Sequence, residues 1–346
     1  MNPSGIEWCD YTWNPITGCL HECPYCYARR MTARFAGDVR LNKMAKKDYS
    51  LVSANNGEDL YVLDAPMLNE TGKPLVYPFG FAPTLHRYRM DTPAKLKMGK
   101  NIFVGAMADM FGAWIPDSWL DEVFEVCTQH SIHNYLFLTK YTQRYEQYCV
   151  PAGENMWYGT TITRENDIGR IIYLPAERRK FVSIEPLMED IEPQNNYLMF
   201  RRTDWVIIGA ETGKRKDKTV PQLEWVKKIV LEAERNGIPV FMKDSLLPIV
   251  GEENMRKDFP SQLKNSKISP KMKKKLYDIC AQCKVSLKKS EMITLLARSK
   301  RGEQPKQFGF MCKDCFKEFC KKLGLDLPEL AELAQSITFG PGDDDG

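Results

Sequence analysis

The sequence predicts an α/β protein whose strands form a partial (β/α) barrel, followed by a small cysteine-rich unit. Six apolar runs recur at intervals of 22 to 34 residues through the middle of the chain. Each run is continuous rather than alternating, which is typical of parallel strands buried on both faces. The segments between the runs have helical patterns, so strands and helices alternate. The runs are residues 101–108, 134–140, 156–162, 180–187, 204–211 and 238–243.

A further strand is expected over residues 5–13, after which Asn14-Pro15 turns the chain. With the six runs it gives six or seven units, too few for a closed eight-unit barrel. A partial, open barrel fits this number, and so does a doubly wound sheet. Helices are expected over residues 27–35, 118–127 and 221–236.

Residues 37–100 contain several Gly and Pro and no regular pattern. The segment is too long for an ordinary connection, so an insertion with structure of its own is expected. His86, Arg87 and Arg89 within it are candidates for binding a substrate. A surface loop with an incidental histidine and two solvated arginines is the alternative.

Three cysteines, Cys19, Cys23 and Cys26, lie in a CxxxCxxC spacing between the first strand and the first helix. Three thiolates can hold three irons of a cubic 4Fe–4S cluster, which leaves the fourth iron open to a ligand that is not protein. With His21 the cysteines could instead form a three-Cys-one-His zinc site, although the spacing differs from that of zinc fingers. Unrelated thiols are the remaining alternative.

Ionisable residues stand where five of the apolar runs end. In barrels of this kind the carboxyl ends of the strands carry the site. We therefore expect these side chains to meet at one rim and to hold cofactor and substrate there, with structural salt bridges as the alternative. The candidate catalytic residues are Asp109, Lys140, Glu185, Glu211 and Lys243.

The cysteine spacing, with Tyr25 just before Cys26, resembles the signature of the radical S-adenosylmethionine (radical SAM) superfamily. The resemblance implies that SAM binds the open iron and that Tyr25 lies near its adenine. Residues 4–246 also resemble an uncharacterised, phage-associated family of radical SAM-like proteins with an N-terminal three-cysteine motif. The motifs are Ile6-Glu7-Trp8, Thr12-Trp13-Asn14-Pro15, Asp109-Met110-Phe111-Gly112, Leu138-Thr139-Lys140, Ser183-Ile184-Glu185-Pro186-Leu187 and Gly209-Ala210-Glu211-Thr212-Gly213.

This resemblance implies a partial barrel of the radical SAM type and names no substrate. The chain departs from better-known superfamily members after the second strand, where a SAM-binding Gly-Gly-Glu is usual and Gly105-Ala106-Met107 stands instead. A similar Gly209-Ala210-Glu211 occurs near the sixth strand. SAM contacts beyond the cluster are therefore not assigned from the motifs.

The chain of 346 residues is 43% hydrophobic, which supports a sizeable core and two units. No run of eighteen apolar residues exists, so no transmembrane helix and no membrane partner are expected. The first residues have neither a basic region nor an apolar core, so no secretory signal is expected. Eleven cysteines without such a signal indicate metal ligation in the cytoplasm. The resemblance to the phage-associated family implies that the cell is bacterial or a phage-infected host.

The net charge of +4 is unevenly distributed. Residues 256–322 carry +13, residues 323–346 carry −6, and residues 1–255 carry −3. A basic segment indicates a polyanionic partner, most simply nucleic acid, with a merely solvated charge run as the alternative. The candidate nucleic-acid contacts are Lys273, Lys274, Lys275, Lys288, Lys289, Arg298, Lys300 and Arg301.

Two CxxC pairs lie in this basic part of the chain, Cys280 with Cys283 and Cys312 with Cys315. Four thiolates in this pattern predict a closed, structural zinc site in a zinc-ribbon-like unit. A unit this short needs a structural metal for stability, because its hydrophobic core is small. A zinc module that binds protein or only stiffens the fold is the alternative. The expected domains are a barrel at 1–250, a basic linker at 251–275, a zinc-binding unit at 276–322 and an acidic tail at 323–346, disordered at its end.

Together these features predict a radical SAM enzyme that takes an electron from a donor, cleaves SAM reductively and abstracts hydrogen from a substrate. Nucleic acid or a nucleotide is the candidate substrate, through the basic unit. The main alternative is a nucleic-acid-binding protein with two structural metal sites and no catalysis. A redox relay that uses a cluster without SAM is a third possibility.

Overall fold

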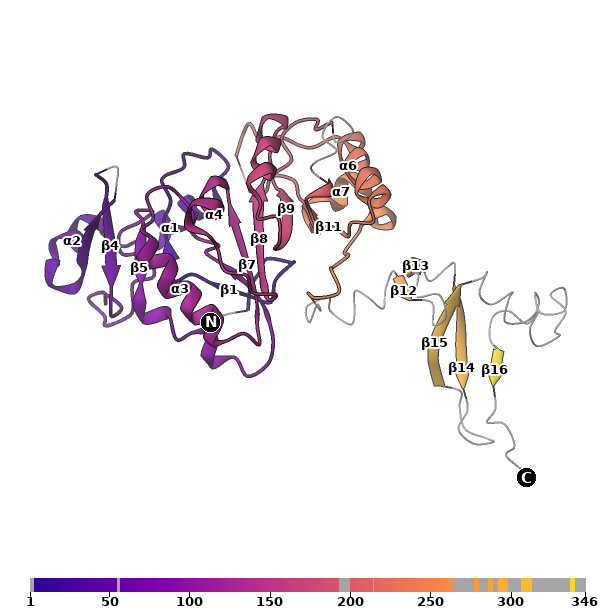
Figure 1. Ribbon diagram of the computed structural model, residues 1–346, viewed down its shortest axis with the longest axis horizontal. Coiled ribbons are helices and arrows are strands. Elements are labelled where there is room, and N and C mark those ends of the chain that lie inside the picture. Colours follow the sequence, from indigo (N-terminus) through magenta and orange to yellow (C-terminus); the bar gives the residue numbers. More distant parts are fainter. Residues whose placement is uncertain are drawn as a thin grey trace, which may run out of the picture. The chain divides into compact units, whose positions relative to one another are not determined.

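A computed structural model of the chain describes residues 3–54, 57–192, 200–213 and 215–263, and five short strands beyond them (Figure 1). The chain divides into two compact units, Met1–Lys267 and Ile268–Gly346. The first unit contains a seven-stranded sheet and a four-stranded sheet. Among the described residues, no helix has the length and apolar character that crossing a membrane requires.

The large sheet is a curled half-barrel whose seven strands run parallel and neighbour one another in chain order. This confirms the predicted α/β class and the partial, open barrel, and every predicted apolar run overlaps a strand. The strands are β1 (Tyr11–Trp13), β6 (Asn101–Val104), β7 (Asn134–Thr139), β8 (Met156–Thr161), β9 (Arg179–Ile184), β10 (Val206–Ile208) and β11 (Val240–Met242).

The first strand is shorter than the expected 5–13, because only Tyr11–Trp13 pair with β6. The residues before it turn, and the Ser4 N–H donates to the Asp10 carbonyl over 2.9 Å. This turn places the Trp8 ring against the sheet, where the centres of the Trp8 and Phe103 rings are 4.7 Å apart. An amino-terminal turn thus contributes a large side chain to the core instead of extending the strand.

Successive side chains on each strand enter two different cores, which explains the continuous apolar runs. On β6, Val104 packs in the outer core between sheet and helices, whereas Phe103 packs in the inner core on the other face. On β10, Ile208 is in the outer core and Ile207 in the inner core. The inner core is mainly aromatic and consists of Trp8, Cys9, Phe103, Leu136, Trp157, Phe181, Trp205, Ile207, Phe241 and Leu263.

The helices of the half-barrel bury apolar stripes in the outer core. In α3 (Asp117–Gln129), which overlaps the helix predicted at 118–127, the buried stripe includes Leu120, Val123, Phe124 and Cys127. In α6 (Leu223–Arg235) the buried stripe includes Val226 and Val230, and Gly237 follows with a φ of +68°. Further helices in the described part of the chain are α1 (Tyr27–Phe35), α2 (Val39–Met44), α4 (Gln143–Tyr148) and α7 (Leu247–Val250), with a 3-10 helix at Glu165–Tyr173 between β8 and β9.

The insertion at 37–100 has structure of its own, as predicted. Its sheet has the order β2-β5-β4-β3, from Ile16–Thr17, Thr84–His86, Asp59–Leu63 and Ser50–Ser53. The candidate substrate residues in it have structural partners instead. The buried His86 Nε2 lies 2.8 Å from Thr17 Oγ1, and the Arg87 guanidinium pairs with Asp64 and Glu122.

Residues 251–263 pack on the half-barrel, although the sequence predicted that a linker begins there. Phe241 forms a β-bridge with Lys257, and the centres of the Phe259 and Trp205 rings are 5.1 Å apart. Leu263 is fully buried in the inner core. The few apolar residues of this polar stretch all face the sheet, so the stretch belongs to the half-barrel.

The second unit is described only as short strands. β12 (Tyr277–Ile279) pairs antiparallel with β13 (Ser286–Lys288), and β14 (Met292–Ala297) pairs antiparallel with β15 (Lys306–Cys312). β16 (Ile337–Phe339) pairs parallel with β14. The side chains of the predicted zinc ligands and nucleic-acid contacts lie outside the described residues, so both sites remain predictions.

We expect Leu263→Ala to lower the free energy of unfolding by about 2–5 kcal/mol, because it removes a buried side chain from the inner core. Urea unfolding followed by tryptophan fluorescence measures the change. The matched control is Leu247→Ala, whose side chain is 42% exposed. Equal stabilities of the Leu263→Ala variant and the wild type would show that residue 263 lies in a linker after all.

Candidate functional site

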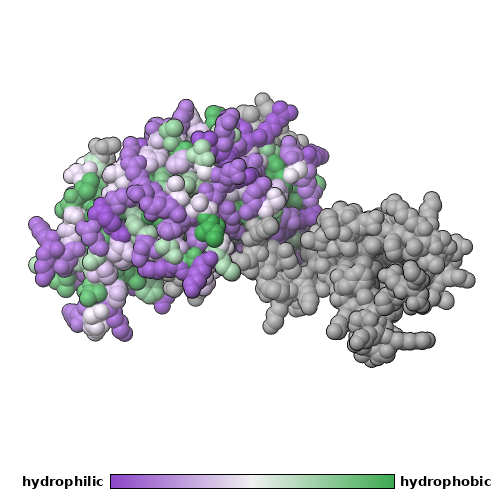
Figure 2. Space-filling model, turned by 60° about the horizontal axis from the view of Figure 1, so that its bottom comes forward, coloured by the Kyte–Doolittle hydropathy of each residue, from purple (hydrophilic) through white to green (hydrophobic). Residues whose placement is uncertain are grey.

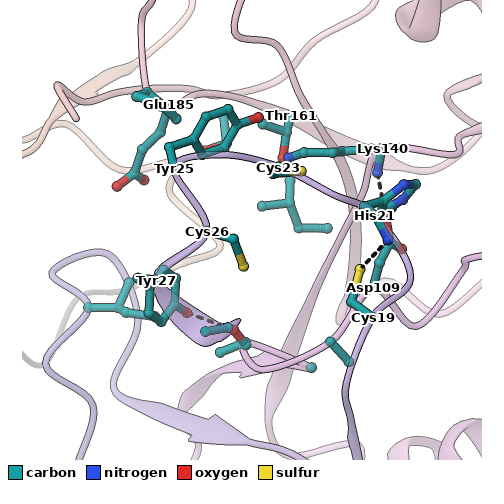
Figure 3. Close-up of a pocket in the computed structure, with 18 of the residues that line it drawn as sticks. Cys19, His21, Cys23, Tyr25, Cys26, Tyr27, Asp109, Lys140, Thr161 and Glu185 are labelled. Atoms are coloured by element: carbon teal, nitrogen blue, oxygen red, sulfur yellow. Dashed lines mark hydrogen bonds and ion pairs between the residues drawn. The ribbon is translucent and has the colours of Figure 1, made fainter. Parts of the chain in front are cut away.

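A cavity of about 410 Å³ opens at the carboxyl ends of the parallel strands. Its volume lies within the range of small-molecule sites, about 300–1,000 Å³. The walls come from strand ends and from the cysteine loop (Figure 3). The structure thus brings together every barrel residue that the sequence singled out, namely Cys19, Cys23, Tyr25, Cys26, Asp109, Lys140, Glu185, Glu211 and Lys243.

The cysteine loop is held at both ends by backbone contacts. Gly18 has a φ of +87°, and its N–H donates to the Met107 carbonyl over 2.9 Å. A Cβ at Gly18 would lie 2.3 Å from the Ala82 carbonyl oxygen, so only glycine fits here. At the other end Cys26 is the N-cap residue of α1. The loop therefore enters the cavity in a fixed position.

Two of the three sulfurs accept backbone hydrogen bonds. Cys26 Sγ accepts from the Arg29 N–H and Cys19 Sγ from the His21 N–H, each over 3.4 Å. Helix N-termini favour negative charge, and so lower the free energy of a thiolate. Burial, and next the Asp109 carboxylate, raise the pKa of Cys19 to about 12. A thiolate here needs a positive counter-charge, which a bound metal supplies.

The donor set can accommodate an iron–sulfur cluster. The three cysteines lie around a common space (Figure 3), and three thiolates can ligate three irons of a cubic cluster. His21, the fourth ligand of the zinc alternative, has its Nε2 3.0 Å from Asp109 Oδ2.

Asp109 fixes the geometry behind the cysteine loop. Its carboxylate accepts hydrogen bonds from the Thr139 hydroxyl over 2.7 Å and from the Lys140 N–H over 3.0 Å. The same carboxylate lies next to the His21 ring. Burial acts to raise the pKa of Asp109, but hydrogen bonds from His21, Lys140 and Thr139 outweigh it and hold the pKa below its usual value. The carboxylate thus joins the loop to the ends of β6 and β7.

Tyr25 lies beside Lys140 on one side of the cavity (Figure 3), with the Lys140 ammonium 5.6 Å from the centre of the Tyr25 ring. This geometry is a cation–π contact. Burial raises the pKa of Tyr25, so its phenol is neutral. The contact holds an aromatic face and a cation at the same wall.

Glu185, after β9, and Lys243, after β11, form an ion pair at the cavity wall. Gly209, the residue after β10, lies between them. A Cβ at Gly209 would lie 3.1 Å from Lys243 Cδ and 3.2 Å from Glu185 Cγ. The missing side chain therefore leaves room for the two charges to meet. Both keep part of their surface exposed, at 23% for Glu185 and 17% for Lys243.

Glu211 is held by the protein rather than directed at a ligand. Both of its oxygens accept hydrogen bonds from the Arg215 guanidinium, each over 2.7 Å, and one also accepts the Thr219 N–H. The hydrogen bonds from Arg215 hold the pKa of Glu211 below its usual value. This bidentate pair fixes the segment after β10 at the rim.

Sequence reasoning missed several cavity residues. Thr161 and Ser183 line the cavity from the ends of β8 and β9, and their place at strand ends could have identified them. Tyr27 donates its hydroxyl to the Ala106 carbonyl over 2.6 Å, which ties α1 to the end of β6. Arg215 was not singled out, because its pairing with Glu211 depends on the conformation of the segment after β10.

The fold and site define an α/β half-barrel protein with a thiol-lined cavity at its strand ends. Residues 3–278 match the model of the family described as "Protein of unknown function (DUF5131)", and the chain belongs to this family. No curated protein matches the chain.

Solved structures of spore photoproduct lyase are similar at low identity. The complex with dinucleoside spore photoproduct shares 12% identity at a TM-score of 0.42, covering 70% of this chain and 79% of the lyase chain. A mutant of that lyase with bound AdoMet and the same ligand shares 10% identity at a TM-score of 0.37, covering 95% and 76%. Below a TM-score of 0.5 such a likeness defines neither a shared fold nor a shared activity.

We expect Asp109→Ala to lower the free energy of unfolding by about 1–3 kcal/mol, because the buried Thr139 hydroxyl and Lys140 N–H lose their acceptor. Urea unfolding measures the change. Asp117→Ala is the control, since that carboxylate is 61% exposed in its pair with Arg144 and should contribute at most about 1 kcal/mol. Equal losses in both variants would contradict the anchoring role.

Proposed function

We propose that the protein is a radical SAM enzyme. One observation carries the proposal: three cysteines of a fixed loop surround one cavity whose opposite walls hold charged residues. When bound, a 4Fe–4S cluster and SAM supply an electron and a 5′-deoxyadenosyl radical that abstracts hydrogen from the substrate. Cys19, Cys23 and Cys26 are the residues that would hold the cluster.

The chain's part in holding the cluster is to stabilise thiolates. The N–H groups of His21 and Arg29 donate to two sulfurs, and the N-terminus of α1 faces Cys26. Hydrogen bonds to cluster sulfurs and burial are the means by which proteins set the potential of such clusters. An external electron donor is required, because a reductive cleavage consumes an electron.

We assign the polar groups of SAM to the wall residues that keep exposed surface. Glu185 and Lys243 offer a carboxylate and an ammonium side by side, which complement the amino and carboxylate groups of a methionyl end. Tyr25 offers an aromatic face for adenine, with Lys140 against its ring. Asp109 and Glu211 are positioning residues instead, because protein donors already occupy their oxygens.

The cavity floor excludes water from the reacting atoms. Trp8 and Phe103 belong to the inner core and line the cavity, as does Leu138, which packs against that core. A dry apolar floor under a charged rim protects a reactive species from side reactions. The substrate therefore enters from the rim. Nucleic acid or a nucleotide is our proposed substrate, and the zinc unit at 276–322 remains part of the proposal.

The first test is metal content. We expect anaerobically reconstituted protein to hold about four irons in the N-terminal site, with one further zinc in the predicted four-cysteine site. Cys23→Ala should lose most of the iron, whereas Cys149→Ala, an exposed cysteine outside the motif, should keep it. Plasma emission spectrometry measures both metals. Iron-free protein with two zincs would support a non-catalytic binding protein instead.

The second test is SAM cleavage. Dithionite-reduced, cluster-loaded protein should form 5′-deoxyadenosine from SAM, detected by liquid chromatography with mass spectrometry. Its absence, despite an intact and reducible cluster, would favour a redox relay and contradict the proposal.

A third test concerns the ion pair. Glu185→Gln should weaken SAM binding about tenfold or more, because a hydrogen bond to a charged group contributes about 1.5–3 kcal/mol. Anaerobic equilibrium dialysis with labelled SAM measures the affinity. Glu224→Gln on α6, an exposed glutamate paired with Lys227, is the control. Unchanged affinity in Glu185→Gln would assign the ion pair to structure alone.

A further inference from the structure

Residues 29–47 are a strongly basic segment of the first unit. They include seven Lys/Arg and a single Asp, for a net charge of +6, whereas residues 1–255 as a whole carry −3. All seven cationic side chains are exposed. We call this set the basic helical surface; it comprises Arg29, Arg30, Arg34, Arg40, Lys43, Lys46 and Lys47 on α1, α2 and the 3-10 turn after them.

Three of these charges form no ion pair with a described residue that would account for them in the fold. Within the described residues, no carboxylate forms an ion pair with Arg30, Arg34 or Arg40, whereas arginines such as Arg87 and Arg144 are paired. Arg30 and Arg34 are four residues apart on α1, a spacing at which like charges repel. The helix buries only Ala28 and Thr32. Such a surface costs stability unless a partner neutralises it.

Apolar side chains lie among the charges. Tyr27, Met31 and Phe35 on α1 are 45%, 43% and 50% exposed, and Met44 at the end of α2 is 70% exposed. On the face seen in Figure 2, polar residues predominate and apolar residues form small separate patches. Cations interleaved with exposed rings and thioethers suit a ligand with phosphates and flat bases.

The basic helical surface begins at the mouth of the cavity. Tyr27 and Ala28 line the cavity, and the Arg29 guanidinium lies 4.8 Å from the centre of the Phe81 ring, which lines it too. On the other side, Arg30 Nη2 lies against Gly213, 3.2 Å from where a Cβ would be. Two arginines of the segment therefore lie beside residues at or next to the rim.

We infer that the basic helical surface docks single-stranded nucleic acid and leads one nucleotide into the cavity. Arginines at the surface bind phosphates, and exposed rings such as Phe35 stack on bases. A single strand is favoured because its bases can reach a recessed site without the unpairing and unstacking that a duplex requires. The inference deepens the proposed function. The reaction of the nucleotide in the cavity rests on that function, whereas docking on the surface needs neither iron nor SAM.

The test measures binding of a fluorescent 20-nucleotide oligothymidylate to the full chain by anisotropy, over a series of salt concentrations. The Arg30→Gln, Arg34→Gln, Arg40→Gln triple variant should bind at least about tenfold more weakly at low salt. Its plot of log affinity against log salt should flatten by about 2, since each phosphate contact contributes about 0.7. The control removes the same charge elsewhere, by Lys97→Gln, Lys227→Gln and Arg235→Gln, and should change affinity less than about threefold.

All chains carry Lys273→Gln, Lys274→Gln and Lys275→Gln, so that the basic segment there does not mask the effect. A second variant, Phe35→Ala, should weaken binding about tenfold through lost stacking. Its control is Leu231→Ala on α6, whose side chain is 53% exposed. Because Phe35 carries no charge, weaker binding by the Phe35→Ala variant would report contact with bases rather than general charge attraction.

Three outcomes would overturn the inference. In the first, the triple variant binds the oligonucleotide as tightly as its charge-matched control does. In the second, the chain with the wild-type surface binds no oligonucleotide. In the third, that chain binds phosphatidylglycerol vesicles more tightly than the oligonucleotide, and the triple variant loses this binding. None of these outcomes would affect SAM cleavage by the wild-type chain. Conversely, failure of SAM cleavage with intact docking would refute only the proposed chemistry.

Discussion

The parallel alignment of seven strands is the constraint on which the site depends. Because all strands run in one direction, the residues that follow them meet at one edge of the sheet, although they lie far apart in the sequence. Asp109 and Lys243 line the same cavity for this reason. The inner core makes the arrangement rigid, since rings such as Trp157 and Trp205 fill the concave face beneath it. The charged rim therefore rests on a packed base rather than on mobile loops.

The cysteine loop shows how backbone geometry prepares a ligand site before the ligand arrives. Gly18 enters the loop with a conformation and a close approach that no side chain tolerates, and Cys26 leaves it as a helix cap. Buried thiols are costly to ionise, as the raised pKa of Cys19 indicates. N–H donors reduce this cost only in part, so the loop is best stabilised when positive metal atoms share the space between the sulfurs.

Much of the half-barrel and its rim could be predicted, because strands buried on both faces leave continuous apolar runs and are followed by polar residues. The predicted rim residues, such as Glu185, indeed line the cavity. Partners could not be predicted in the same way. The pairing of Glu211 with Arg215 depends on a loop conformation, and the burial of Leu263 depends on one apolar residue in a polar stretch that resembles a linker. His86 looked available in sequence, but two hydroxyls surround its ring.

The charged residues of the rim divide according to whether the protein already satisfies them. Asp109 and Glu211 have their oxygens occupied by donors of the chain, so a ligand that displaced those donors would lose as many hydrogen bonds as it gained. Glu185, Lys243 and Lys140 are bound less completely and keep the freedom to exchange partners. A site that fixes two carboxylates to shape its walls and leaves both signs of charge at its opening is adapted to a zwitterionic ligand. The arginines of α1 then add a field that favours anionic ligands approaching from outside.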